Sequence, residues 1–185
     1  VSALTNVVKV LAGKHIRPTV SRVDLCVDFV TDASLDPIPR EHWVTRAKKK
    51  HSHDVGNRFS GYVFGQGSSI SCRLYDKTLE LKESKKDYLL PLWEKSGWDG
   101  KSNVWRLEFQ FNREVLSEMR INSVPEMKQQ LNALWQYATQ SWLQLKYPND
   151  NDKNKSRWSV YPVWETLSNT TFNENAVEPL LRVRK

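Results

Sequence analysis

In Arg22–Val23–Asp24–Leu25–Cys26–Val27–Asp28–Phe29, polar and apolar side chains alternate along the whole stretch. Successive side chains of a β-strand point to opposite faces, so this pattern predicts a strand with one polar and one apolar face. Asp is a poor strand former, and two Asp residues inside an apolar strand indicate that the polar face has a role beyond solvation.

Two later stretches repeat the pattern. In residues 72–77 one face carries Arg73, Tyr75 and Lys77, and in residues 105–111 one face carries Arg106, Glu108 and Gln110. If the three strands share a sheet, their apolar faces pack on helices and their polar faces meet on the other side. The expected fold class is therefore α+β, with an antiparallel β-sheet, helices packed on one face, and an open face that carries the candidate site.

The remaining elements follow from periodicity and turn residues. Apolar spacing predicts helices over residues 1–12 and 125–146, and a charged stretch is expected to form a helix over residues 80–87. Runs rich in β-branched and apolar residues predict strands over residues 20–30, 59–64, 70–77 and 104–112. The strands 59–64 and 70–77 are expected to form a hairpin with a long Gly/Ser loop. Residues 31–58 are expected to form a loop with one short helix, and residues 148–155 a linker. We expect a main domain over 1–147 and a C-terminal extension of short elements over 148–185.

Composition narrows the class of protein. The 185 residues carry a formal net charge of +7, which favours a polyanionic partner such as nucleic acid. Cys26 and Cys72 lie far apart in apolar runs, so we expect two buried thiols in a reducing, cytoplasmic setting. No apolar run approaches the roughly 20 residues that span a bilayer, and no signal peptide is visible, so no membrane partner is expected.

The polar face combines groups that suit phosphate chemistry. The carboxylates of Asp24, Asp28 and Glu108 are hard oxygen ligands of the kind that bind Mg²⁺ or Mn²⁺. Cations beside Tyr75 would stabilise a phenolate and a bound phosphate together. The alternative is a solvated sheet face with cross-strand salt bridges, in which Tyr75 only packs.

Three blocks of residues, in order, resemble a known family. Residues 22–28 are similar to its Arg-x-Asp-x-x-x-Asp strand. Residues 65–69 followed by 73–77 are similar to its Gly/Ser stretch and Arg-x-Tyr-Asp-Lys motif, and residues 106–108 to its Arg-x-Glu strand. The family is that of the trans-acting replication initiators of rolling-circle plasmids, which includes relaxases of some integrative conjugative elements. The blocks span residues 20–112, about half of the chain.

The resemblance implies a fold related to the HUH nucleases and a metal-dependent, site- and strand-specific DNA nickase. It implies that Tyr75 attacks a phosphodiester to give a 5′-phosphotyrosyl link and a free 3′-hydroxyl. It further implies a divalent cofactor, Mg²⁺ or Mn²⁺, on Asp24, Asp28 and Glu108, and charge stabilisation by Arg73, Lys77 and Arg106. The expected partner is DNA, single-stranded or extruded at the nick site. Residues 1–147 would then form the catalytic nicking domain, and the extension over 148–185 would pack on it or contact DNA. A host helicase and a homodimer are compatible with the resemblance.

The sequence also departs from the family pattern. Gly67 stands where members often carry Arg, and no His-hydrophobe-His pair is present. The segment His51–Ser52–His53 is interpreted as a DNA contact in a loop, not as a metal site. Most of the part that usually precedes the acidic strand is absent, which is compatible with an N-terminally truncated chain.

Other candidates and rival functions stay open. The basic run Arg46, Lys48, Lys49 and Lys50 predicts a DNA-backbone contact, with a solvated loop as the alternative. Trp135 and Trp142 are expected in the core. One rival is a DNA-binding protein of the same fold that does not cut, acting in origin recognition. Another is a metal nuclease that activates water, with Tyr75 only structural.

Overall fold

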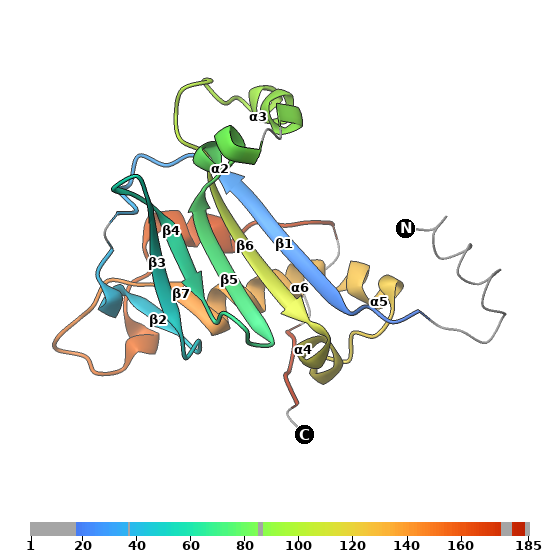
Figure 1. Ribbon diagram of the computed structural model, residues 1–185. Helices are drawn as coiled ribbons and strands as arrows, with labels where there is room; N and C mark the ends of the chain where they lie inside the picture. The colour runs from blue at the N-terminus through green and yellow to red at the C-terminus, as the bar shows by residue number, and fades with distance from the viewer. Residues whose placement is uncertain (1–17, 37, 85–86, 175–178, 184–185) are drawn as a thin grey trace.

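The computed structural model describes residues 18–36, 38–84, 87–174 and 179–183. Its centre is a five-stranded antiparallel sheet in the order β1-β6-β5-β4-β3. These strands are β1 (Arg22–Phe29), β6 (Trp105–Asn112), β5 (Ile70–Asp76), β4 (Arg58–Phe64) and β3 (Lys50–Val55). The expectation of an antiparallel sheet, with the three patterned strands side by side, is confirmed (Figure 1).

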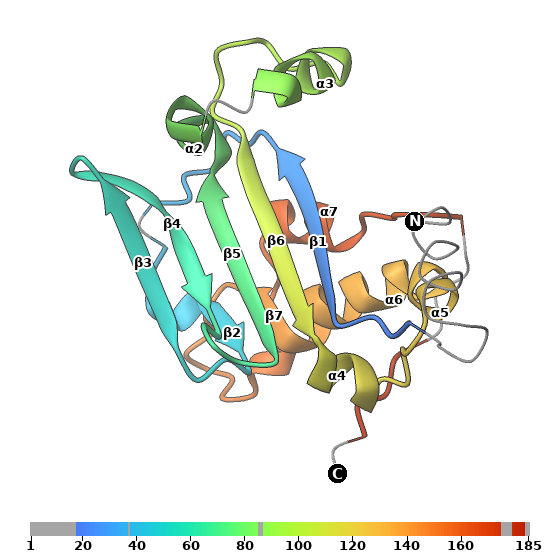
Figure 2. The ribbon, with the colours of Figure 1, turned by 45° about the vertical axis from the view of Figure 1, so that its right-hand side comes forward.

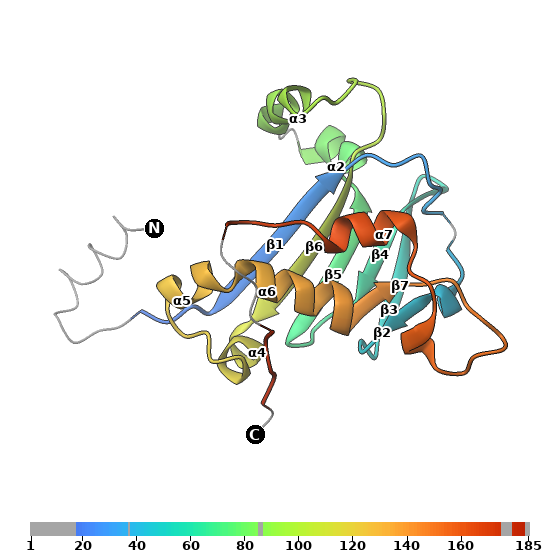
Figure 3. The same ribbon diagram turned by 180° about the vertical axis from the view of Figure 1, so that it is seen from behind.

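Helices and a small second sheet cover one face of the large sheet. On this face lie α6 (Leu131–Gln136), a π-helix (Tyr137–Trp142) and α7 (Pro162–Ser168), which are in front of the large sheet in the view from behind (Figure 3). The small sheet pairs β2 (Trp43–Thr45) with β7 (Leu143–Leu145). Among the residues that the structure describes, no such layer covers the other face of the large sheet, so their polar side chains on that face are accessible (Figure 2).

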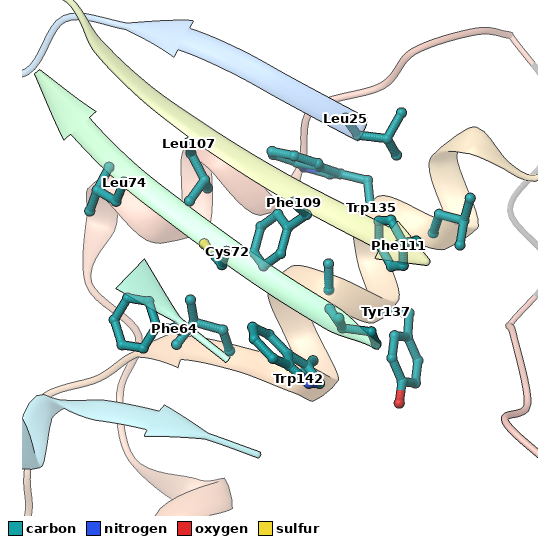
Figure 4. Packing of buried hydrophobic residues seen from close by; sticks show 14 of the residues in the cluster. Leu25, Phe64, Cys72, Leu74, Leu107, Phe109, Phe111, Trp135, Tyr137 and Trp142 are labelled. Carbon is teal, nitrogen blue, oxygen red and sulfur yellow. The ribbon is translucent and has the colours of Figure 1, made fainter. Parts of the chain in front are cut away.

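The core lies between the large sheet and this layer. Leu107, Phe109 and Phe111 of β6 are fully buried, and so are Trp135 and Leu134 of α6. Figure 4 shows the rings of Phe109, Phe111 and Trp135 in this core, next to β5 and β6. The side chains of Phe64, Cys72 and Trp142 lie in the same cluster. Trp135 and Trp142 are therefore core residues, as the sequence predicted, and the apolar face of every patterned strand is the buried one.

The connection from β5 to β6 forms a separate small unit at one end of the sheet. It contains α2 (Lys77–Ser84), a 3-10 turn (Asp87–Leu89) and α3 (Leu90–Lys95). A second apolar cluster of Leu81, Trp93 and Val104 holds it together. We call residues 77–104 the β5–β6 insertion. It stands above the end of β5, next to the open face (Figure 1).

Two expectations about secondary structure are wrong. Residues 31–58 are not only a loop with a short helix (Arg40–His42), because they also contain β2 and β3. Residues 125–146 are not one helix, because α5 (Val124–Gln129), α6 and the π-helix follow each other and the chain then becomes β7. The indole of Trp164 donates to the carbonyl oxygen of Thr139 at 2.9 Å, which satisfies a carbonyl in the widened turn.

The other boundaries agree with expectation within a few residues. A short helix, α4 (Arg113–Glu118), follows β6 directly, and a 3-10 turn (Lys155–Arg157) lies in the polar stretch before α7. The helix expected over residues 1–12 lies outside the described residues. Within the part of the chain that the structure describes, no helix is long and apolar enough to cross a membrane.

Candidate active site on the open face

Strand register places the candidate nucleophile in a row of polar residues across the open face. Tyr75 of β5 lies opposite Arg106 of β6, and Arg106 lies opposite Asp28 of β1. On its other side Tyr75 lies opposite Gly61 of β4, which lies opposite His53 of β3. Directly opposed residues in an antiparallel sheet share a face, so this row runs across all five strands on one side.

A second row lies two residues along the strands. Arg73 of β5 lies opposite Glu108 of β6, and Glu108 lies opposite Cys26 of β1. The Arg73 Nη2 and Glu108 Oε1 atoms are 3.0 Å apart and form a cross-strand ion pair. Tyr75, Asp28 and Glu108 therefore share one face, together with Asp24, which lies opposite Gln110 further along β1.

A cavity of about 440 Å³ opens between these rows and the β5–β6 insertion. Gly61 lines the cavity without a side chain. A Cβ at this position would lie 2.3 Å from the Leu74 carbonyl oxygen and 2.8 Å from the Tyr75 Cα, so β4 and β5 approach too closely for any other residue. The side chains that give the cavity its chemistry are those of Tyr75, three cations, two carboxylates and one imidazole: Tyr75, Arg73, Lys77, Arg106, Glu80, Glu108 and His53. The three residues expected to act on a phosphate beside Tyr75 (Arg73, Lys77 and Arg106) thus line one cavity with it.

Tyr75 sits in a mixed electrostatic environment. Burial raises the pKa of its phenol to about 12, and the nearby Glu108 carboxylate adds to the increase. Arg106 acts in the other direction, through its charge and through a side-chain hydrogen bond. The expectation that the flanking cations would favour a phenolate is therefore wrong for the protein alone, because burial and Glu108 outweigh them.

Lys77 is the most deeply buried cation of the site. Its side chain is 2% exposed, its ammonium group pairs with the carboxylate of Glu80, and its Nζ lies 5.6 Å from the centroid of the Tyr75 ring. A buried ammonium group next to a cavity attracts an anion more strongly than an exposed one, because water screens it less. The first turn of α2, which carries both Lys77 and Glu80, thus brings charge to the edge of the cavity.

The three predicted metal ligands do not fit a single ion. Asp24 and Asp28 are four residues apart on a regular strand, so their Cα atoms are separated by about 13 Å. Ligand oxygens lie only about 2.1 Å from a bound Mg²⁺. Only Glu108 of the three lines the cavity, while Asp24 pairs with Arg22 and Asp28 with Arg106. Among the described residues there is no group of three or more His, Cys, Asp or Glu side chains that could hold a metal ion.

The predicted basic run divides between two surfaces. Arg46, Lys48 and Lys49 are exposed in the β2–β3 connection. Lys50 begins β3 and faces the covered side, with its Nζ 4.9 Å from the centroid of the Tyr62 ring and 5.6 Å from that of Trp43. Burial lowers the pKa of Lys50 to about 8. The structure therefore separates Lys50 from the open face on which Tyr75 lies.

The residues 50–55 form an edge strand, not the expected loop, and this changes the reading of the histidines. Because His53 pairs with Gly61 and His51 with Val63, both face the open side. His53 and Glu80 both belong to the cavity. The sequence had placed His53 in a DNA-contacting loop and had not marked Glu80 as a site residue. The two histidines alternate with Lys50, Ser52 and Asp54, as residues on the two faces of a strand do. All of these residues are polar, so no alternation of polar and apolar residues indicated a strand. The expectation for Cys26 is also wrong, because its thiol is exposed on the open face, whereas Cys72 is buried as expected.

Comparisons with known proteins give one informative match. No family model matches the sequence, and no curated protein matches it. Among solved structures, the chain is similar to a rolling circle replication initiator protein from Geobacillus stearothermophilus, with a TM-score of 0.53 and 18% sequence identity. The match covers 81% of this chain and 55% of that chain, so this chain spans little more than half of that protein's length. At this identity the match shows the fold alone, and the expected fold class, an antiparallel sheet with helices packed on one face, is confirmed.

Proposed function

We propose that this protein nicks one strand of DNA with Tyr75 as the nucleophile, as an initiator of rolling-circle replication or a related relaxase. The observation that carries the proposal is the cavity itself. It combines a tyrosine with three cations, Arg73, Lys77 and Arg106, on the open face of a sheet whose fold is that of a rolling circle replication initiator.

The cations match the charge that a phosphodiester presents. Guanidinium groups form bidentate hydrogen bonds with phosphate oxygens, and a buried ammonium adds a point charge. Negative charge on the phosphoryl oxygens grows during in-line attack, so fixed cations in a partly enclosed site stabilise the transition state more than the ground state. Arg73, Lys77 and Arg106 take this role, and the bare backbone at Gly61 leaves room for the phosphate.

The reaction forms one bond and breaks one. The phenol oxygen of Tyr75 bonds to phosphorus and the bond from phosphorus to the 3′-oxygen breaks. The 3′-oxygen leaves with the bonding electron pair and takes up a proton from water to become the free 3′-hydroxyl, which balances the proton that the phenol loses. Because the pKa of Tyr75 is about 12, the phenol is neutral at physiological pH and must lose its proton as it attacks. His53, Glu80 and Glu108 line the same cavity and are the groups able to accept that proton.

A divalent cation, Mg²⁺ or Mn²⁺, remains part of the proposal in a restricted form. Mg²⁺ is commonly held by one or two carboxylates, several waters and substrate phosphate oxygens. Glu108 is the predicted ligand that lies where such an ion would meet the phosphate. The three predicted carboxylates do not converge on one position, so protein side chains carry the steps of the attack.

DNA is the proposed partner, and the exposed run of Arg46, Lys48 and Lys49 extends its contact surface. The nearest strand position, Lys50, lies opposite Phe64, three residues from Gly61, and therefore roughly 10 Å along β4. A backbone that leaves the cavity along β3 and β4 would reach these cations within a few nucleotides. A host helicase and a homodimer are further proposals that rest on the family resemblance alone.

The decisive experiment traps the covalent intermediate. The protein is mixed with Mn²⁺ and randomised single-stranded oligonucleotides that carry a label at either the 3′ or the 5′ end. A 5′-phosphotyrosyl link predicts that the 3′ label migrates with the protein on a denaturing gel and that the 5′ label is released. Tyr75→Phe is expected to abolish the adduct, because phenylalanine has no nucleophilic oxygen.

Each rival predicts a different pattern in this assay. An adduct that persists in Tyr75→Phe would show that another residue is the nucleophile. Cleavage without any adduct would favour a nuclease that activates water. Binding of DNA with neither cleavage nor adduct would favour a DNA-recognition protein, in which the pairs Arg73–Glu108 and Arg106–Asp28 only stabilise the sheet face.

A further inference from the structure

Both carboxylate oxygens of Asp28 already accept hydrogen bonds from fixed donors. Arg106 donates from Nε to Oδ1 at 2.5 Å and from Nη2 to Oδ2 at 2.7 Å. The indole Nε1 of Trp93 donates to Oδ2 at 2.9 Å. The Asp28 and Arg106 side chains are 18% and 15% exposed, so water screens the pair little. Two parallel hydrogen bonds of this kind fix the orientation of the guanidinium plane and the position of its charge.

Arg106 is the link between Asp28 and the candidate nucleophile. It lies opposite Asp28 on one side and opposite Tyr75 on the other. It also lines the cavity, whereas Asp28 does not. A guanidinium without a partner would sample several rotamers, so the carboxylate behind it decides where its free N–H groups point. The orientation of Arg106 toward Tyr75 therefore depends on Asp28.

The same contacts argue against Asp28 as a metal ligand. A cation at Asp28 would have to displace a guanidinium that is held at two points, and would then face its charge at short range. Asp24, the other acidic residue of β1, lies about 13 Å away along the strand and cannot complete a site with Asp28. The donors around Asp28 come from a sheet strand and from α3, which leaves its carboxylate enclosed by hydrogen-bond donors.

We propose that Asp28 is a positioning residue that holds Arg106 against Tyr75 and the scissile phosphate, and that Trp93 fixes Asp28 from the β5–β6 insertion. This inference rests on the proposed nicking function and departs from the ligand role that the sequence had suggested. It connects the insertion to the nucleophile through three side chains in series, Trp93, Asp28 and Arg106.

Asp28→Asn is the sharpest variant. Arg106 and Trp93 can only donate, and an asparagine amide offers one acceptor oxygen and one donor group, so at least one contact turns into a donor–donor clash. We expect adduct formation to slow by about 10–100-fold, as when a group that orients a reacting residue is lost. Trp93→Phe keeps the ion pair, removes the indole hydrogen bond and leaves an aromatic ring in the cluster with Leu81 and Val104, and a smaller loss of about two- to five-fold is expected.

Three readouts separate positioning from ligation and from a general loss of structure. Mn²⁺ affinity, measured from the electron paramagnetic resonance signal of free Mn²⁺, should stay within about two-fold of the wild type in Asp28→Asn, because the residue is not a ligand. The Arg106 Nε–H resonance in nitrogen–proton NMR spectra should shift and exchange faster in that variant. In an Arg106→Gln background, Asp28→Asn should cause no further loss of adduct, because the two residues act as one unit.

Asp152→Asn is the matched control. Asp152 forms a similar two-point pair with Arg157, at 2.7 Å for both contacts, in a connection that contributes nothing to the cavity. It should leave adduct formation unchanged. A ten-fold or greater loss of Mn²⁺ affinity in Asp28→Asn, or an unchanged adduct rate in it, would overturn the inference. Absence of the adduct in the wild type would instead overturn the proposed function itself, before any variant is compared.

Discussion

Gly61 and Tyr75 lie directly opposite each other in β4 and β5, and the glycine has a φ of +156°. A Cβ at position 61 would meet backbone atoms of Leu74 and Tyr75 at 2.3 and 2.8 Å, so any side chain there must push the two strands apart. The absence of a side chain thus serves both the pairing of the strands and the space beside the phenol ring.

Gly61→Ala should lower the free energy of unfolding by about 3 kcal/mol, because it combines an unfavourable φ with a displaced strand. Urea denaturation measures this value. Gly67→Ala is the control, since Gly67 also has a positive φ but a Cβ there would meet nothing within 4 Å. It should cost only about 1 kcal/mol. Equal losses in the two variants would contradict the close approach of β4 to Tyr75.

The phenol of Tyr75 should ionise at a higher pH than the phenol of an exposed tyrosine. Its pKa is about 12 in the folded protein, against about 10 for an unperturbed tyrosine. Subtracting the near-ultraviolet titration of Tyr75→Phe from that of the wild type should therefore show no phenolate near pH 10.5. A difference signal with a midpoint at pH 10 would show that the ring is not held against Glu108 in a buried site.

The raised pKa of Tyr75 also makes the free energy of unfolding depend on pH in a defined direction. The unfolded chain releases the Tyr75 proton before the folded protein does, so folding is favoured fully below about pH 10 and this contribution is lost as the pH rises through about 12. Between these values the wild type should lose stability faster than Tyr75→Phe. Because Tyr75 is only partly buried, solvent screens its interactions and the difference between the two proteins should be small.

His53 and His51 offer a matched pair on one strand. Both face the open side, but only His53 lines the cavity. His53→Gln should slow adduct formation by at least about ten-fold if the imidazole takes part in proton transfer or holds the phosphate. His51→Gln should change the rate little. Equal rates for the two variants would remove His53 from the site.

The lysines of the basic run should differ in their contribution to DNA binding. Replacing Lys48 and Lys49 by Gln should make the slope of log affinity against log salt shallower by about 0.7 for each phosphate contact that is lost on single-stranded DNA. Lys50→Gln should leave the slope unchanged and reduce stability, because Lys50 lies against the rings of Trp43, Tyr62 and Phe64. Fluorescence anisotropy at several salt concentrations measures the slopes.

The sequence predicted the strands whose side chains alternate and missed those whose side chains do not. β5 and β6 bury one face along most of their length, and β1 buries Val23 and Leu25 and partly buries Val27 and Phe29. This burial is reflected in their alternating composition. β3 is an edge strand with almost wholly exposed polar residues, so nothing in its hydrophobicity separated it from a loop. β7 was missed because Leu143 and Leu145 continue the apolar spacing of the preceding helix, and only pairing with β2 decides their conformation.

The candidate site was predicted in part for a similar reason. Alternation placed Tyr75, Arg106 and Glu108 on a common face, and the register of β5 and β6 agrees with this. Alternation says nothing about position along a strand, and position is what separates Asp24 from Asp28. Nor could it show that Glu108 faces Arg73 and that Asp28 faces Arg106, since these two pairs depend on which strands are neighbours.

The docking of α7 on the back of the sheet affects how the chain can be divided. Trp164 and Leu167 are nearly fully buried in the same core as Phe109 and Trp135, and the Trp135 indole donates to the Leu167 carbonyl oxygen at 2.8 Å. Expression of residues 1–147 alone would leave this apolar surface uncovered and the Trp135 donor unsatisfied. Recombinant fragments and fusion proteins should therefore retain the chain at least through Ser168, and shorter versions should yield aggregated material.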